Sequence, residues 1–73
     1  MRKLFCLQIE SGDSIKPVAI IEADSESSAL IIARAKGLCT DAQIDSEKAM
    51  APQITASQAM QAPWIKTRLY KAA

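Results

Sequence analysis

The stretch from Ile20 to Gly37 constrains the fold most, because it holds the end of a strand, the start of a helix and the end of that helix. The residues from Val18 to Ala23 are mostly apolar and rich in β-branched side chains, which is typical of a half-buried strand. Asp24 or Ser25 can then accept a hydrogen bond from the free N–H groups of a helix start, and Glu26 adds a negative charge that the helix dipole favours. Gly37 can adopt the left-handed conformation that ends a helix. The pattern predicts a helix that begins at Ser25 or Glu26.

Helical spacing gives this predicted helix two apolar sides. Ala29, Ile32 and Ala33 share the side that we expect to face the core, whereas Ile31 points the other way. A helix that is apolar on two sides is usually covered on two sides. We therefore expect a later segment of the chain to cover Ile31. A homodimer or a partner surface at Ile31 is the alternative.

Residues 3–10 alternate as a strand, and Ser11 to Ser14 are turn residues, so the first two strands should form a hairpin with a loop longer than two residues. Because side chains alternate across a strand, one face of the first strand should carry Phe5 and Leu7, and the other should carry Cys6 and Gln8. With one helix on one face only, we expect the second face to be half apolar and partly exposed.

We expect one or two short helical turns between residue 38 and residue 63. The alternative is a short strand over residues 42–46. It contains a near repeat at a ten-residue offset, in which Gln43, Ile44, Ala49 and Met50 recur as Gln53, Ile54, Ala59 and Met60. Thr55 and Gln58 have capping-box spacing, and Asp45 or Ser46 could cap the first turn. We expect the two repeated methionines to fill gaps over the outer side of the helix, and an adaptable binding surface is the alternative.

The last segment, Trp64 to Lys71, alternates as a strand that carries two aromatic side chains and two cations on one face. If this strand pairs with the first, Arg2 lies nearby. We expect these basic residues to form a surface distinct from the acidic residues of the hairpin and the helix start. The candidate partner-binding residues are Trp64, Lys66, Arg68, Tyr70, Lys71 and Arg2.

Three interpretations compete for this face. It could be the solvated outer face of a small sheet, with the aromatic rings packed on their cationic neighbours. It could bind a protein, since Trp, Tyr and Arg are enriched at interface hot spots. It could also bind nucleic acid by stacking and phosphate contacts. The eight acidic residues in so small a domain favour a protein over a nucleic acid.

Composition restricts the function further. A chain of 73 residues with 49% hydrophobic and 23% charged residues predicts one ordered domain, residues 1–73, without room for a deep active-site cleft. It has no His, no glycine-rich phosphate loop and no nucleophile motif, so we predict no catalytic residues, no metal site and no cofactor. Cys6 and Cys39 lack metal-binding spacing and are expected to be buried reduced thiols rather than a disulfide. No stretch is long enough to cross a bilayer or to act as a secretory signal, so we expect a cytoplasmic protein.

A strand hairpin followed by the pattern I-x-A-x-S-x-x-x-A, here Ile21, Ala23, Ser25 and Ala29, resembles small phage and mobile-element proteins, among them anti-CRISPR proteins with a sheet packed on one helix. The resemblance covers about the first half of the chain, and Ser28 stands where the pattern usually has Glu. It implies a non-enzymatic inhibitor that occupies a surface of a host protein or ribonucleoprotein complex, such as a CRISPR effector. It assigns no functional residue.

Taken together, these patterns predict an α+β domain with an antiparallel sheet of three or more strands, in the order β-β-α-short α-β, packed on one main helix. The predicted function is that of a small binding protein with a macromolecular target and no membrane partner. A nucleic-acid-binding protein and a homo-oligomeric structural subunit are the alternative functions.

Overall fold

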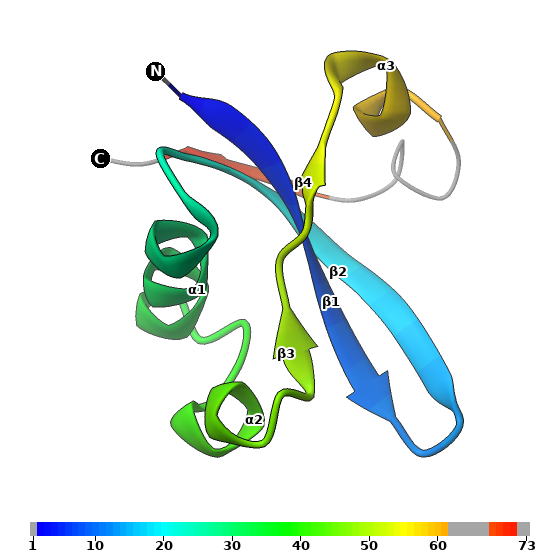
Figure 1. Ribbon diagram of the computed structural model, residues 1–73, viewed down its shortest axis with the longest axis vertical. Coiled ribbons are helices and arrows are strands. Elements are labelled where there is room, and N and C mark those ends of the chain that lie inside the picture. The colour runs from blue at the N-terminus through cyan, green and yellow to red at the C-terminus, as the bar shows by residue number, and fades with distance from the viewer. Residues whose placement is uncertain (1, 62–67, 72–73) are drawn as a thin grey trace.

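The computed structural model describes residues 2–61 and the backbone of residues 68–71 (Figure 1). Its elements in chain order are β1 (Lys3–Ser11), β2 (Ser14–Ala23), α1 (Glu26–Ala35), α2 (Asp41–Asp45), β3 (Ala49–Met50), β4 (Gln53–Ile54), α3 (Ala56–Ala59) and β5 (Arg68–Lys71). The α+β class is confirmed, because an antiparallel sheet packs on one main helix, α1. No helix among these residues is long and apolar enough to cross a membrane.

The hairpin between β1 and β2 is tighter than the sequence predicts. Ser11 pairs with Ser14, so only Gly12 and Asp13 lie outside the strands. Gly12 has a left-handed φ of 60°, whereas Asp13 does not. A positive φ at the first of two central residues is the type II′ arrangement, whose twist matches that of antiparallel strands. The glycine thus allows the two-residue turn that sets the β1–β2 register as far as Gln8 and Pro17, beyond which a bulge shifts the pairing by one residue.

Strand β1 is central in the antiparallel part of the sheet. It pairs with β2 along one edge, and with both β3 and β4 along the other. Between these two short strands, the Cys6 N–H donates a hydrogen bond of 2.9 Å to the Pro52 carbonyl oxygen, so residues 49–54 act as one interrupted edge strand. Pro52 lacks an N–H donor, which suits an edge position.

Strand β5 pairs with β2 in parallel, Ile20 opposite Leu69, so the condition under which Arg2 would lie beside the last strand, its pairing with β1, is not met. The sheet order is β3-β1-β2-β5, with β4 beside β1. Both edges of β1 are already occupied by β2 and by residues 49–54, so the last strand cannot pair with β1, and it pairs with the outer edge of β2 instead. The long connection through α1 permits the parallel pairing, which a short turn could not.

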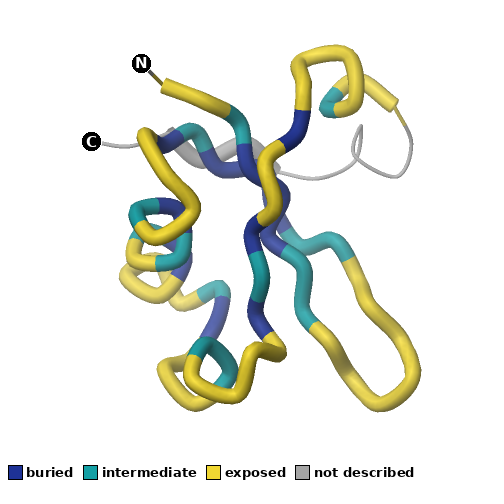
Figure 2. The backbone as a smooth tube through the Cα atoms, in the orientation of Figure 1, coloured by how far each residue is buried: buried dark blue, intermediate teal, exposed yellow. Residues whose placement is uncertain are grey.

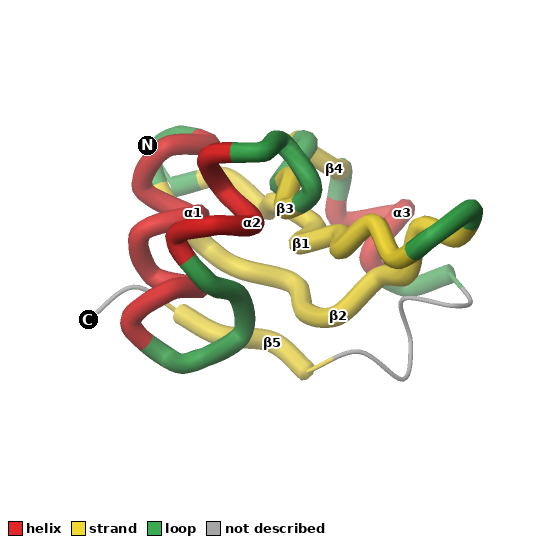
Figure 3. The backbone as a smooth tube through the Cα atoms, turned by 90° about the horizontal axis from the view of Figure 1, so that it is seen from below, coloured by secondary structure: helices red, strands yellow, loops and turns green. Residues whose placement is uncertain are grey.

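The sheet buries apolar side chains on both faces. The larger core lies under α1, and it includes Phe5 and Leu7 of β1 together with Ala29 and Ala33 of the helix. The smaller core, on the opposite face, contains Cys6, Ile20 and Ile54, with Leu4 and Ala59 packed against it. Helices α1 and α3 accordingly lie on opposite sides of the sheet (Figure 3).

The predicted alternation of β1 is confirmed, but the second face is better covered than expected. Cys6 and Ile20 are 0% and 5% exposed. The added cover comes from the residue 49–59 segment, whose Ile54 belongs to β4 and whose Ala59 belongs to α3. Both cysteines are free and buried, as predicted. They belong to cores on opposite faces of the sheet, which explains why they form no disulfide.

The helix boundaries follow local capping. The Ser25 hydroxyl accepts a hydrogen bond from the Ser28 N–H at 3.1 Å, which confirms the predicted start of α1. Thr55 and Gln58 form the predicted capping box of α3. Residues 41–45 form α2, so the competing strand assignment is wrong. The cap of α2 is Thr40, paired with Gln43 in a second capping box, and not Asp45 or Ser46, which lie at the end of the helix.

Candidate partner-binding surfaces

The candidate strand face is only partly within the described structure. Trp64 and Lys66 lie outside the described residues. The backbones of Arg68, Tyr70 and Lys71 belong to β5, the last strand in the sheet order. Arg2, which directly precedes β1, is exposed.

The sheet register shows how the basic residues are distributed. Glu22 of β2 pairs with Leu4 on one side and with Lys71 on the other. Arg2 and Lys71 therefore belong to the same end of the sheet, but β2 lies between their strands. The first residues of β1 and the last residues of β5 lie at this end, in the upper left of Figure 1.

Acidic residues also lie at this end, which corrects the expected separation of charges. Lys3 pairs with Ala23, and the next acidic residues in the chain, Asp24 and Glu26, start the helix there. The hairpin acids are at the far end, as expected, but the helix start is not. The turn from β2 into α1 returns beside the N-terminus of β1, a neighbourhood that only the antiparallel pairing creates.

The outer side of α1 exposes a large apolar side chain. Ile31 is 62% exposed, so the expected cover by a later segment is wrong for the described chain. The side of α1 turned away from the sheet includes exposed residues (Figure 2). The physical reason is the path of residues 49–54, which pair with the edge of β1 and do not run over the helix. Met60, expected to fill a gap above the helix, is 73% exposed, and Ile15 near the hairpin is 55% exposed.

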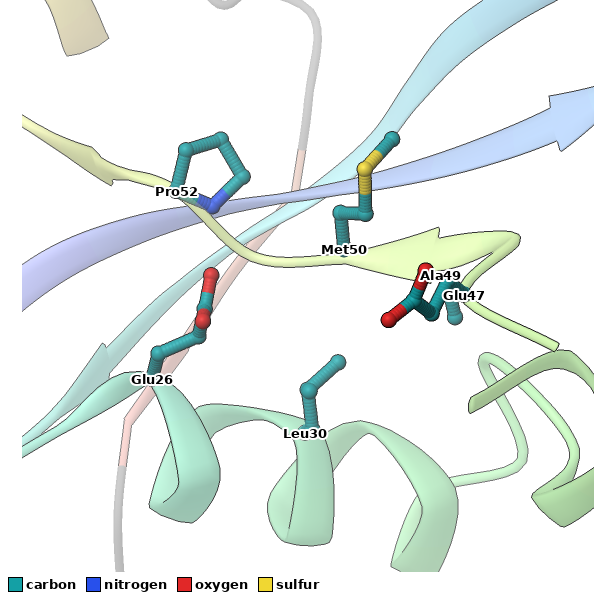
Figure 4. A pocket seen from close by; sticks show the side chains of 6 residues that line it. All are labelled: Glu26, Leu30, Glu47, Ala49, Met50 and Pro52. Atoms are coloured by element: carbon teal, nitrogen blue, oxygen red, sulfur yellow. The ribbon is translucent and has the colours of Figure 1, made fainter. Parts of the chain in front are cut away.

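A hollow of about 440 Å³ lies between α1 and the interrupted edge strand (Figure 4). Helix α1 contributes Glu26 from its first turn and Leu30 from the next turn. Two carboxylates, Glu26 and Glu47, thus flank an otherwise apolar lining. The remaining lining residues are Ala49, Met50 and Pro52.

Glu47 reaches this hollow from an unusual backbone conformation. It has a left-handed φ of 61°, the one such non-glycine residue in the described chain. The Glu47 N–H donates to the Ile44 carbonyl oxygen at 3.1 Å, and the Lys48 N–H donates to that of Gln43 at 2.8 Å. These two hydrogen bonds form the Schellman motif, which usually has glycine at the left-handed position. Helix α1 ends in the same motif with Gly37.

Glu47→Gly is therefore expected to stabilise the protein. Glycine adopts a left-handed φ without the steric cost of about 1–2 kcal/mol that a Cβ brings. Part of this gain is lost to the greater freedom of glycine in the unfolded chain. We expect Glu47→Gly to be about 1 kcal/mol more stable than Glu47→Ala, which also removes the carboxylate but keeps the Cβ. Urea unfolding of both variants measures the difference, and equal midpoints would contradict the steric argument.

An exposed ion pair joins the end of α1 to the start of α2. Arg34 Nε lies 3.2 Å from Asp41 Oδ1, with both side chains more than half exposed, so the pair contributes at most about 1 kcal/mol.

Burial raises the pKa of the nearby Cys39 thiol, and the Asp41 carboxylate raises it further. A thiol with a raised pKa is a poor nucleophile. Within residues 2–61 and 68–71, no group of three or more His, Cys, Asp or Glu side chains could hold a metal ion.

Comparisons with known proteins return no relative. No protein-family model matches the chain, no curated protein matches its sequence, and no solved structure significantly matches its fold.

The hollow and its two glutamates are the part of the candidate surfaces that sequence reasoning missed. Glu26 was visible only as a favourable charge at a helix start, and Glu47 lies in a segment that the near repeat marked as helical. A signal for the first short helix was present in the sequence, since Thr40 and Gln43 have the same spacing as Thr55 and Gln58. No local pattern indicates that residues 47–52 pack opposite the first turns of α1.

Proposed function

We propose that this chain is a small, non-enzymatic binding protein that acts in the cytoplasm by occupying a surface of a larger macromolecular complex. The observation that carries the proposal is the peripheral position of β5, the last strand in the sheet order. An edge strand is accessible to another molecule, and this one belongs to the segment that contains Trp64, Arg68 and Tyr70. These residue types are the ones enriched at protein-binding hot spots.

The target that we propose is a host protein or ribonucleoprotein complex, with a CRISPR effector as the candidate that the resemblance to small phage proteins suggests. Such a protein would inhibit its target by covering a functional surface, without chemistry of its own. The charge arrangement favours this function over nucleic-acid binding. Asp24 and Glu26 follow the end of β2 that pairs with Lys3, and Glu22 lies between β1 and β5. These carboxylates lie close to the basic residues, so they would repel the phosphates of a bound nucleic acid.

A homo-oligomeric subunit is the second candidate function, and the exposure of Ile31 favours it. A β-branched side chain that is 62% exposed on the outer side of a helix could pack against its copy across a two-fold axis. In that case the mass measured by light scattering would exceed that of the 7.9 kDa monomer. Replacing Ile31 with Asp would then restore the monomer.

The test of the proposed function is capture from a bacterial lysate with the tagged full chain, with and without nuclease. We expect a defined set of proteins to survive nuclease treatment. Trp64→Ala, and separately the double variant Lys66→Glu with Arg68→Glu, should lose at least 90% of this capture while keeping the wild-type circular dichroism spectrum.

The matched control is the double reversal Lys16→Glu with Lys48→Glu, which changes the net charge equally at two exposed residues outside β5. It should capture the same proteins as the wild type. Full capture by folded Lys66→Glu with Arg68→Glu would contradict the assignment of the surface. Recovery that disappears with nuclease would instead identify a nucleic-acid-binding protein.

A further inference from the structure

The hollow between α1 and residues 47–52 combines two kinds of surface. Leu30, Met50 and Pro52 supply apolar lining, while Glu26 and Glu47 supply carboxylates from opposite sides (Figure 4). Its volume of about 440 Å³ falls within the range of about 300–1,000 Å³ that is usual for ligand pockets. An occupant that suits both surfaces must be apolar along its length and positively charged at its end.

The two carboxylates have no cationic partner of their own in the described chain. The ion pair present among residues 2–61 joins Arg34 to Asp41, on the connection between α1 and α2. Glu26 and Glu47 are both exposed, so each carboxylate is hydrated and available to a cation from outside. In Figure 4 the two carboxylates lie on either side of Leu30, so a cation bound above Leu30 would have one negative charge on each side.

We propose that this hollow binds an arginine side chain presented by a partner protein. The three methylene groups of arginine match the apolar lining. Its planar guanidinium has five N–H donors, which can be shared between two carboxylates, whereas lysine offers a single compact charge. This site goes beyond the proposed function, because it has the opposite charge to the strand segment and involves none of its residues.

The left-handed conformation of Glu47 suggests a test variant that changes the charge of the site and leaves its backbone unchanged. Glycine is the residue that fits a left-handed position best, but a glycine there would remove one of the two carboxylates. Glu47→Gln keeps both the length of the side chain and the strained backbone, and removes only the charge. This variant separates the effect of the charge from that of the backbone conformation.

The test is titration of the ¹⁵N-labelled full chain with the peptide acetyl-Gly-Leu-Arg-Leu-Gly-amide, followed by nuclear magnetic resonance. We expect the largest amide shifts at residues that line the hollow, among them Leu30 and Met50. The same peptide with citrulline in place of arginine keeps the shape without the charge, and it should bind at least tenfold more weakly. Equal shifts with both peptides would overturn the proposal.

The variants give an independent result. Glu26→Gln and Glu47→Gln should each weaken arginine-peptide binding by about threefold to tenfold, and together they should abolish the shifts. The double change Glu10→Gln with Asp13→Asn, at the exposed far end of the hairpin, removes the same charge and should leave binding unchanged. Equal losses in both double variants would overturn the site in favour of a general charge effect. Trp64→Ala should bind the peptide as the wild type does, so failure of the strand-face proposal is distinguishable from failure of this one.

Discussion

Ala33→Asp is expected to leave the protein unfolded at room temperature. Ala33 is 0% exposed in the core between α1 and the sheet, so an aspartate there would bury a charge without a designed partner. Burying an unpaired charge costs several kcal/mol. A domain of this length has only about 3–5 kcal/mol of stability from its core. The loss therefore equals or exceeds the whole free energy of unfolding, and circular dichroism should show no cooperative melt.

The matched control is Ala35→Asp on the same helix. Ala35 is exposed, lies two residues further on and is also in the last turn, so the negative charge meets the same unfavourable helix dipole. The two variants thus differ in burial and not in helix propensity or net charge. We expect Ala35→Asp to lose about 1 kcal/mol or less. A cooperative melt of Ala33→Asp close to that of Ala35→Asp would show that α1 packs through another face.

Stability is expected to fall steeply between pH 9 and pH 11 because of Cys6. Burial raises the pKa of the Cys6 thiol from 9.0 to about 11. This thiol is 0% exposed and lies 3.7 Å from the Leu7 carbonyl oxygen, to which it donates a weak hydrogen bond. Because the pKa is higher in the folded protein, the folded state holds its proton more tightly than the unfolded chain does. The corresponding stability is complete below pH 9 and is lost as the pH rises through about 11.

The size of this effect follows from the shift, since each pKa unit corresponds to about 1.4 kcal/mol. We expect a loss of about 2–3 kcal/mol, a large part of the stability of so small a domain. Urea unfolding at pH 8, 9, 10 and 11 measures it, in a reducing buffer that prevents oxidation of the thiols.

Cys6→Ala separates the contribution of this thiol to the pH dependence of stability from that of every other group. The variant should be less stable than the wild type at pH 8, because it leaves a small cavity in the core. Its stability should then fall less between pH 9 and pH 11, so the two curves converge. Parallel curves would show that Cys6 does not ionise on unfolding.

Local patterns predicted a large part of this fold. The Ser25 cap, the left-handed Gly37 and the Thr55–Gln58 box act over three to six residues, so the sequence contains both partners of each interaction. The alternation of Phe5 and Cys6 between two cores follows from the two-residue period of a strand. The free cysteines followed from their lack of any metal-binding or disulfide pattern.

The candidate surfaces were predicted less well. The position of the aromatic-cationic segment in a strand was confirmed for its last four residues, Arg68–Lys71, while Trp64 and Lys66 lie outside the described residues. That strand joins β2 in parallel, and Ile31 stays exposed in the described chain, neither of which the helix or strand periods could indicate. Periodicity tells which face of an element is apolar, but it does not tell which element covers that face.

The sequence by itself therefore determined the type of the main elements, β1, β2 and α1, and which of their faces are apolar. The caps, the turn and the side-chain periods that decide this involve residues close together in the chain. The tertiary structure alone decided that residues 49–54 pair with the free edge of β1, which excludes β5 from that edge and, among the described residues, leaves Ile31 on the outer side of α1 exposed. It also brought Glu47 opposite Glu26 across the hollow. These contacts join residues more than twenty positions apart, and they depend on the strand order of the complete sheet.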